Sequence, residues 1–214
     1  MYLPHPTVAI VGYLRPFALS LRGTGCTEEV FFINKRNKSL QLTALLAMLV
    51  AISIVCGKYL ALNLGETMRF SLENMPIIFA GMAFGPAAGL AVGAIADIVG
   101  CLMVGYTVNP IVTLGGASIG LIAGICFRLL KKVNLHPCIL TAITVVVAHF
   151  IGSVIIKTLG LSAYYSMPLI ILMLWRLLNY IIVGTLDGII VHTLLYNKGI
   201  QIKISALKEN KNDI

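Results

Sequence analysis

The sequence predicts an all-α integral membrane protein with six transmembrane helices and both termini in the cytoplasm. Three observations support this: 58% of the 214 residues are hydrophobic, only 11% are charged, and long uncharged runs recur along the chain. A soluble domain averages about 45–50% apolar and about 25% charged residues. This chain therefore lacks the polar side chains needed to cover a water-exposed surface, and we expect no appended soluble catalytic domain.

The helices follow from the uncharged runs, because a helix needs about 20 mostly apolar residues to cross a bilayer core of about 30 Å. Charged residues, glycine and proline mark where the runs end. The second helix is the shortest, and a Phe84-Gly85-Pro86 turn separates it from the third. The predicted helices cover residues 40–60, 75–85, 87–104, 110–130, 138–158 and 168–196.

Lysine and arginine indicate the orientation. Twelve of the sixteen lie before the first helix, between the fourth and fifth, or in the C-terminal tail. Basic loops stay on the cytoplasmic side, so both termini are predicted there, in agreement with an even helix count. The other four, predicted on the outer side, are Lys58, Arg69, Lys157 and Arg176. The net charge of +8 does not indicate nucleic acid, since the bases form no stripe with interleaved aromatic residues.

This layout divides the chain into three regions. Residues 39–197 form the six-helix membrane domain, and residues 198–214 form a basic cytoplasmic tail. Residues 1–38 contain an apolar stretch too short to span, with no basic residue before it, which argues against a signal peptide. We expect this extension to be disordered or surface-lying, or to reflect a start codon placed too far upstream.

Ionisable residues inside the predicted spans are candidates for function, because a charge at mid-membrane costs about 2.5–3.5 kcal/mol. Four occur, at Asp97, His149, Arg176 and Asp187. Arg176, Asn179 and Asp187 share one face of the last helix by their 3.6-residue spacing. This stripe either contributes to a site or forms an internal hydrogen-bonded pair. Asp187 suits the pair better, Arg176 lies where a solute can reach it, and His149 is expected to be a core residue.

Small residues recur along three helices, where they let helix backbones approach closely. Those of the third and fourth helices indicate packing within the bundle, whereas Ala47 and Ala51 on the first helix could equally face a partner. The glycines concerned are Gly89, Gly93 and Gly100, and Gly116, Gly120 and Gly124. The five cysteines lack metal-ligand spacing, so we expect small core residues and predict neither a metal site nor a cofactor.

Motifs exclude several enzyme classes. The Gly-Lys pair at residues 57–58 is followed by tyrosine, so the chain has no P-loop for ATP hydrolysis. Residues 116–120 read GxSxG, which in a soluble hydrolase requires a strand–turn–helix elbow rather than a spanning helix. A rhomboid-like intramembrane serine protease using Ser118 stays open as an alternative. Against it, Ile119 replaces the glycine that follows the serine, and the candidate base His149 lies on the fifth helix.

Several motifs between the first and third helices point to one family. The chain has Arg69-Phe70-Ser71, then MPII at 75–78, AGMAFGP at 80–86 and AIADIVG at 94–100. With Arg176 and Asn179 on the last helix, these motifs resemble the substrate-binding S components of energy-coupling factor (ECF) vitamin transporters, most closely the folate-specific branch. The resemblance covers residues 40–196.

The resemblance implies a six-helix subunit that holds a vitamin in an outward-opening pocket in the bacterial plasma membrane. Energy would come from a transmembrane coupling protein and two ATPase subunits, which accounts for the missing P-loop. In the family an alanine motif on the first helix docks the coupling protein. Residues 47–51 (AMLVA) match it, which implies docking through Ala47 and Ala51. The implied substrate is folate, or another vitamin such as pantothenate.

The residues themselves also favour folate. The outer side carries a surplus of two positive charges, and an arginine fork suits a carboxylate of the glutamate tail. Aromatic side chains would supply walls for the rings, and Asn109 and Thr113 would bond the pterin edges. The predicted substrate-binding residues are Arg69, Phe70, Tyr106, Asn109, Thr113, Tyr164, Arg176 and Asn179. A transporter or channel that works without partners is a further alternative.

Overall fold

A computed structural model describes residues 26–64, 68–133, 135–165 and 168–208. The chain divides into two units, Met1–Leu42 and Thr43–Ile214. In the first unit, the described residues form the beginning of helix α2 (Cys26–Ile54). The second unit contains the rest of α2 and every later element, and all contacts below lie within it. Residues 1–25 of the predicted extension lie outside the described residues.

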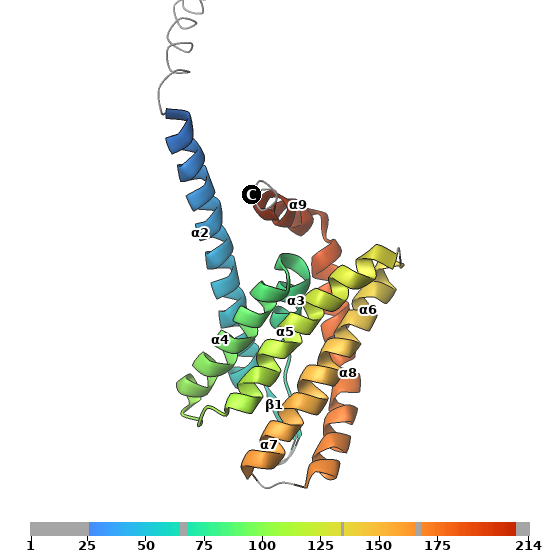
Figure 1. Ribbon diagram of the computed structural model, residues 1–214. Coiled ribbons are helices and arrows are strands. Elements are labelled where there is room, and N and C mark those ends of the chain that lie inside the picture. The colour runs from blue at the N-terminus through green and yellow to red at the C-terminus, as the bar shows by residue number, and fades with distance from the viewer. Residues whose placement is uncertain (1–25, 65–67, 134, 166–167, 209–214) are drawn as a thin grey trace, which may run out of the picture. The chain divides into compact units, whose positions relative to one another are not determined.

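Helices make up nearly all of the described chain, as the sequence predicts (Figure 1). After α2 these are η1, a π-helical turn (Val55–Tyr59), α3 (Asn74–Phe84), α4 (Pro86–Val104), α5 (Pro110–Leu130), η2, a 3₁₀ turn (Lys131–Val133), α6 (Pro137–Ala148), η3, a π-helical segment (His149–Lys157), α7 (Thr158–Tyr165), α8 (Leu169–Tyr196) and α9 (Lys198–Lys208). An antiparallel hairpin, β1 (Leu62–Leu64) and β2 (Met68–Phe70), pairs Asn63 with Arg69 between α2 and α3.

The six predicted helices are all present among the described residues, but only five helical segments are long and apolar enough to cross a membrane. The exception is α3, which has 11 residues and is therefore about 16 Å long. Nearly every residue from Asn74 to Ala83 is buried, so α3 is apolar on all sides because it lies inside the bundle. The spanning segments are 39–59, 86–104, 110–133, 137–163 and 169–196.

Some boundaries differ from the prediction. Helix α2 begins at Cys26 instead of near residue 40, and the fifth helix continues through η3 and α7 to Tyr165. The hairpin and α9 were not predicted. Asn197 begins α9 directly after α8, since its side-chain Oδ1 accepts from the Gly199 amide at 3.0 Å. The C-terminal tail is thus helical up to Lys208.

The turn between α3 and α4 depends on Gly85, which has a φ of 106°. Side chains rarely adopt this backbone conformation, and Pro86 then begins α4 with a φ that already suits a helix. A Cβ on Gly85 would also collide with the Arg128 guanidinium, which lies against the turn. The Phe-Gly-Pro motif therefore sets the sharp reversal between α3 and α4.

The helices alternate in direction, so the connections gather at two ends (Figure 1). The α3–α4, α5–α6 and α8–α9 connections lie at what we call the basic end, which carries Arg128, Lys131, Lys132 and Lys198. The hairpin and the α4–α5 and α7–α8 connections lie at the opposite, hairpin end. The core cluster is built mainly on α3, which contacts α4, α5 and α8.

Candidate substrate-binding site

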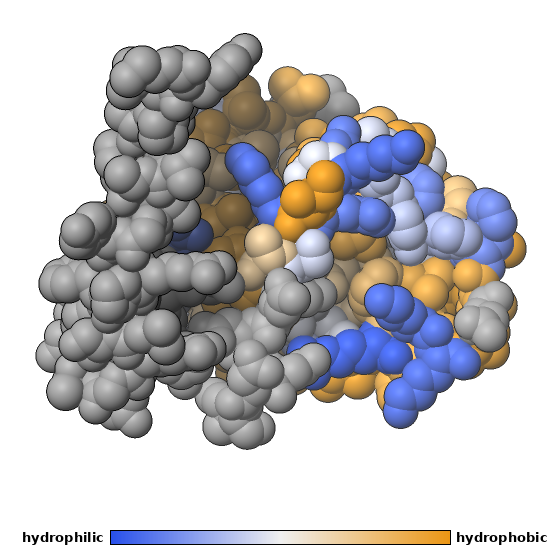
Figure 2. Space-filling view, turned by 90° about the horizontal axis from the view of Figure 1, so that it is seen from above, coloured by the Kyte–Doolittle hydropathy of each residue, from blue (hydrophilic) through white to orange (hydrophobic). Residues whose placement is uncertain are grey.

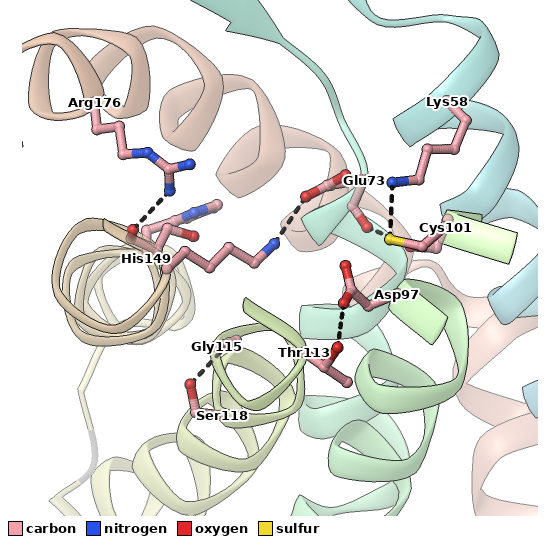
Figure 3. Close-up of polar contacts among 12 residues, drawn as sticks. Lys58, Glu73, Asp97, Cys101, Thr113, Gly115, Ser118, His149 and Arg176 are labelled. Atoms are coloured by element: carbon pink, nitrogen blue, oxygen red, sulfur yellow. Dashed lines mark hydrogen bonds and ion pairs between the residues drawn. The ribbon is translucent and has the colours of Figure 1, made fainter. Parts of the chain in front are cut away.

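A cavity of about 340 Å³ opens at the hairpin end, within the size range of small-molecule sites. Its charged lining residues come from five different places in the chain (Figure 3). They are Lys58 on η1, Glu73 before α3, Asp97 on α4, Lys157 on η3 and Arg176 on α8. Three cations thus face two carboxylates, and the cavity is suited to an anion.

Lys157 is the most deeply buried of these cations, with 5% of its surface exposed. Its Nζ donates to Glu73 Oε1 at 2.8 Å, which compensates for the loss of water around a buried ammonium group. The lysine stem crosses Gly115 of α5, where a Cβ would lie 2.5 Å from Lys157 Cγ. Ser53 Oγ donates to the backbone carbonyl oxygen of Glu73 at 2.7 Å and so holds the partner of Lys157 in place. This pair belongs to the cavity wall.

Lys58 reaches the cavity from the other side. Its stem lies over Gly100 of α4, where a Cβ would be 2.9 Å from Lys58 Cε. Its Nζ lies 3.8 Å from Cys101 Sγ and 5.8 Å from the centre of the Tyr106 ring. Among the described residues it forms no ion pair. These contacts of the ammonium group are therefore with polarisable groups rather than with a carboxylate.

Arg176 is the second cation without a carboxylate partner in the described part of the chain. Its Nη1 donates to the Ser153 carbonyl oxygen at 3.1 Å, which holds the half-buried side chain against η3 (Figure 3). A guanidinium has five N–H donors, so one bond to a carbonyl leaves most of its donors available. Of the cations that line the cavity, Arg176 and Lys58 are thus the two that are most available to bind an anion.

Two other predicted residues, Thr113 and Asn109, form hydrogen bonds that position a cavity side chain and a helix. Thr113 Oγ1 donates to Asp97 Oδ2 at 2.6 Å and so orients a carboxylate at the cavity. The Oδ1 of Asn109 accepts from the Ile111 amide at 3.0 Å and caps α5, while its Nδ2 donates to the Gly160 carbonyl at 3.1 Å. Asn109 therefore joins α5 to α7 and has one remaining N–H for a ligand.

Of the eight predicted substrate-binding residues, the structure brings Tyr106, Asn109, Arg176 and Asn179 together in the cavity lining. Thr113 lies behind Asp97, and Phe70 does not line the cavity. The side chains of Arg69 and Tyr164 lie outside what the structure describes, so their roles stay predictions. The lining residues that the prediction omitted include all four other charged side chains, Lys58, Glu73, Asp97 and Lys157, and also Tyr180.

One residue of the polar stripe on the last helix, Asp187, forms an internal pair with His149. Asp187 is fully buried, and its Oδ2 lies 3.0 Å from His149 Nε2. The His149 ring in turn packs on Tyr180, with 4.9 Å between ring centres, and Tyr180 lines the cavity. His149 is thus buried, as predicted, but it is not a lone core residue. The pair supports one cavity wall from behind.

Ser118 lacks the surroundings of a catalytic nucleophile. Its Oγ donates to the Gly115 carbonyl oxygen at 2.8 Å, which is a bond within α5 (Figure 3). Among the described residues no histidine bonds to it, and His149 Nε2 is occupied by Asp187. The GxSxG spacing therefore reflects the glycines with which α5 packs.

A family model for the ECF transporter, substrate-specific component, matches residues 41–195. Two solved structures share the fold. One is a crystal structure of FolT bound with folic acid, with 24% identity, a TM-score of 0.57, and coverage of 71% of this chain and 90% of that chain. The other is a crystal structure of the S component for biotin from an ECF-type ABC transporter, with 17% identity, a TM-score of 0.59, and coverage of 78% and 96%.

A comparison with curated proteins gives no match. The family match alone covers well over half of the chain and includes every charged residue of the cavity. Proteins of this family bind a vitamin and work with a separate energising module, so the chain is a substrate-binding component and not an enzyme. The chain belongs to the family of substrate-specific S components of ECF transporters.

Proposed function

We propose that this S component captures folate in the cavity at the hairpin end. The observation that carries the proposal is the presence of two cations, Lys58 and Arg176, that line the cavity without an ion pair among the described residues. The glutamate tail of folate has two carboxylates and can engage both cations. Each contact would be a charge-assisted hydrogen bond, and the planar arginine fork suits a carboxylate.

Other features of the cavity support a flat, anionic ligand. Tyr106 and Tyr180 line it, and Leu161 and Leu172 add apolar surface for rings. The similarity to FolT, which was solved with folic acid, favours the same vitamin. Biotin and pantothenate each carry one carboxylate and would leave one cation without a partner. The charge balance disfavours thiamine, which is a cation.

A competition experiment tests the choice of vitamin. The purified chain in detergent should bind folate more tightly than biotin or pantothenate, as measured by isothermal titration calorimetry. Pteroate, which lacks the glutamate tail, should bind more weakly than folate because it cannot engage both cations. Tighter binding of biotin or pantothenate than of folate would overturn the proposal.

Variants locate the contribution of each cation. Arg176→Ala and Lys58→Ala should each lower folate affinity about 10- to 100-fold, since a hydrogen bond to a charged group contributes about 1.5–3 kcal/mol. The same substitutions should affect pteroate much less, because the missing tail removes the interaction. Lys132→Ala removes an exposed charge at the basic end and is the matched control. Equal losses for folate and pteroate would place the tail elsewhere.

The docking site for the coupling protein is a second part of the proposal. Ala47 and Ala51 are both exposed on α2, on the same face as Met48 and Ile52. Small residues on an exposed membrane helix let a partner helix approach closely. This supports docking of the transmembrane coupling protein at Ala47 and Ala51, with two ATPase subunits supplying the energy.

A bulky substitution on α2 distinguishes docking of the coupling protein from folate binding. Ala51→Trp should abolish folate uptake in vesicles that contain the whole transporter, while the purified variant binds folate as before. Ile181→Trp on α8 introduces the same bulk at another exposed position and should leave uptake unchanged. Equal loss of binding and uptake in Ala51→Trp would show that this alanine serves internal packing instead.

The orientation completes the proposal. Arg128, Lys131, Lys132 and Lys198 gather at the basic end, which we assign to the cytoplasmic side of the bacterial plasma membrane by the positive-inside rule. The cavity then opens to the exterior, where a vitamin is captured. Cysteine labelling checks this: a membrane-impermeant maleimide should label Lys132→Cys only after the cells are opened.

A further inference from the structure

A groove of about 660 Å³ lies at the basic end, far from the substrate cavity in the fold. It is bounded by α9 and by the last turns of α3, α5 and α8, which contribute Met82, Ala83, Phe127 and Leu195. Met82 and Ala83 are buried and form an apolar floor. Figure 2 views this end of the molecule and shows hydrophilic side chains gathered around hydrophobic ones. The groove is therefore apolar inside and charged at its rim.

Two lysines form that rim. Lys131 begins η2 directly after α5, and Lys198 begins α9 directly after α8; both are exposed and line the groove. Neither forms an ion pair among the described residues. In the described part of the second unit the acids are Glu73, Asp97 and Asp187, and none of them lies at this end. Among the described residues, no acid therefore compensates the rim charge.

Helix α9 holds Lys198 in place. Ile200 and Ile204 pack against the core cluster, so one side of α9 is anchored to the bundle. The Asn197 side chain caps the helix, which fixes the direction in which its first residue leaves. Lys198, Gln201 and Ser205 face the groove from this anchored helix. The residues that α9 contributes to the groove are therefore held in place by the fold.

We propose that this groove binds an anionic phospholipid of the surrounding bilayer. The phosphate would lie between Lys131 and Lys198, and an acyl chain would cover the apolar floor. The spanning segments end at residues 133 and 196, which places the rim at the level of lipid headgroups and the floor below it. A phosphate group complements the rim, and basic pockets between helices at the cytoplasmic side suit anionic lipid headgroups.

Native mass spectrometry of the purified full chain tests the proposal directly. Phosphatidylglycerol should bind more tightly than phosphatidylcholine with the same acyl chains, because the second lipid has no net charge. The double variant Lys131→Ala/Lys198→Ala should lower phosphatidylglycerol affinity about thirtyfold, at roughly fivefold for each lysine near an anionic headgroup. Lys132→Ala/Lys203→Ala removes the same charge from exposed positions that do not line the groove and should change affinity little.

A third variant tests the apolar part of the site. Ser205→Trp keeps every lysine but fills the groove from an exposed position, and it should also weaken phosphatidylglycerol binding. Substrate binding at the opposite end reports that each variant is folded. Equal losses in the two double variants would overturn the proposal in favour of general surface charge. Displacement by millimolar inorganic phosphate alone would also overturn it, since a free anion would then suffice.

Discussion

Two helix contacts in the same bundle use glycine in opposite ways. Where α4 meets α5, Gly93 faces the backbone at Gly116, and Gly89 faces the backbone at Gly120. Where η3 meets α8, a Cβ on Gly184 would find only His149 Cδ2 at 3.7 Å, and one on Gly188 would find nothing within 4 Å. Glycine is thus a contact residue in the first case and leaves space in the second.

The second contact is joined by polar bonds instead of close backbones. His149 pairs with Asp187, and Arg176 donates to the Ser153 carbonyl. Beside this contact, Thr141 Oγ1 of α6 lies 3.3 Å from His192 Nδ1 of α8. A largely apolar groove of about 520 Å³ beside these bonds includes Gly184 and Gly188 in its lining. The comparison shows that glycine spacing alone does not identify a helix interface. It also shows that the cavity at the hairpin end has one wall in which helix backbones pack closely and another wall that is joined by polar bonds.

The largest effect is expected at the first contact. Gly120→Val should prevent recovery of folded, monodisperse protein, because its Cβ would collide with the carbonyl oxygen of Gly89, which cannot rotate away. Overpacking typically costs about 1–3 kcal/mol and occasionally more, and a clash with backbone leaves least room for relief. Size-exclusion chromatography and thermal unfolding in detergent measure the effect. The smaller substitution Gly120→Ala should also lower the melting temperature. If this variant kept the wild-type melting temperature, the result would contradict the close approach of α4 and α5.

An intermediate effect is expected at the second contact. Asp187→Leu should lower the free energy of unfolding by about 1–2 kcal/mol, the range for polar contacts between membrane helices. Asp187→Asn keeps an oxygen that can accept from His149 Nε2 and should lose less. Denaturant titration of both variants, with and without His149→Ala, gives the coupling energy of the pair. A coupling energy near zero would show that the two side chains do not stabilise the contact.

The helix starts marked by proline were the most predictable feature of this chain. Pro110, Pro137 and the Gly85-Pro86 turn mark helix starts to within about one residue, because proline suits the first helical turn. The hairpin was not predicted because its strands have three residues each, which is too few for an alternating pattern to be recognised. The α3 helix was found, but only its surroundings explain why it is short and still apolar.

The site was less predictable, for a geometric reason. Lys58 and Lys157 lie on the π-helical segments η1 and η3, where a 3.6-residue period no longer gives the direction of a side chain. The sequence places both lysines at the outer side without assigning them to the pocket. Pairing of His149 with Asp187 joins residues 38 positions apart, which no local pattern reveals. Arg176 and Asn179 were found because they lie on a regular helix.

The smallest effect sharpens the comparison most, because it uses the same substitution as at Gly120. Gly188→Ala should leave folding and substrate affinity intact and raise stability by up to about 1 kcal/mol, since alanine is the better helix former and its Cβ meets no atom within 4 Å. Thermal unfolding beside Gly120→Ala checks the pair, with opposite signs expected. If both variants lose stability equally, the space beside Gly188 is filled in the membrane-embedded protein, and the two contacts are alike after all.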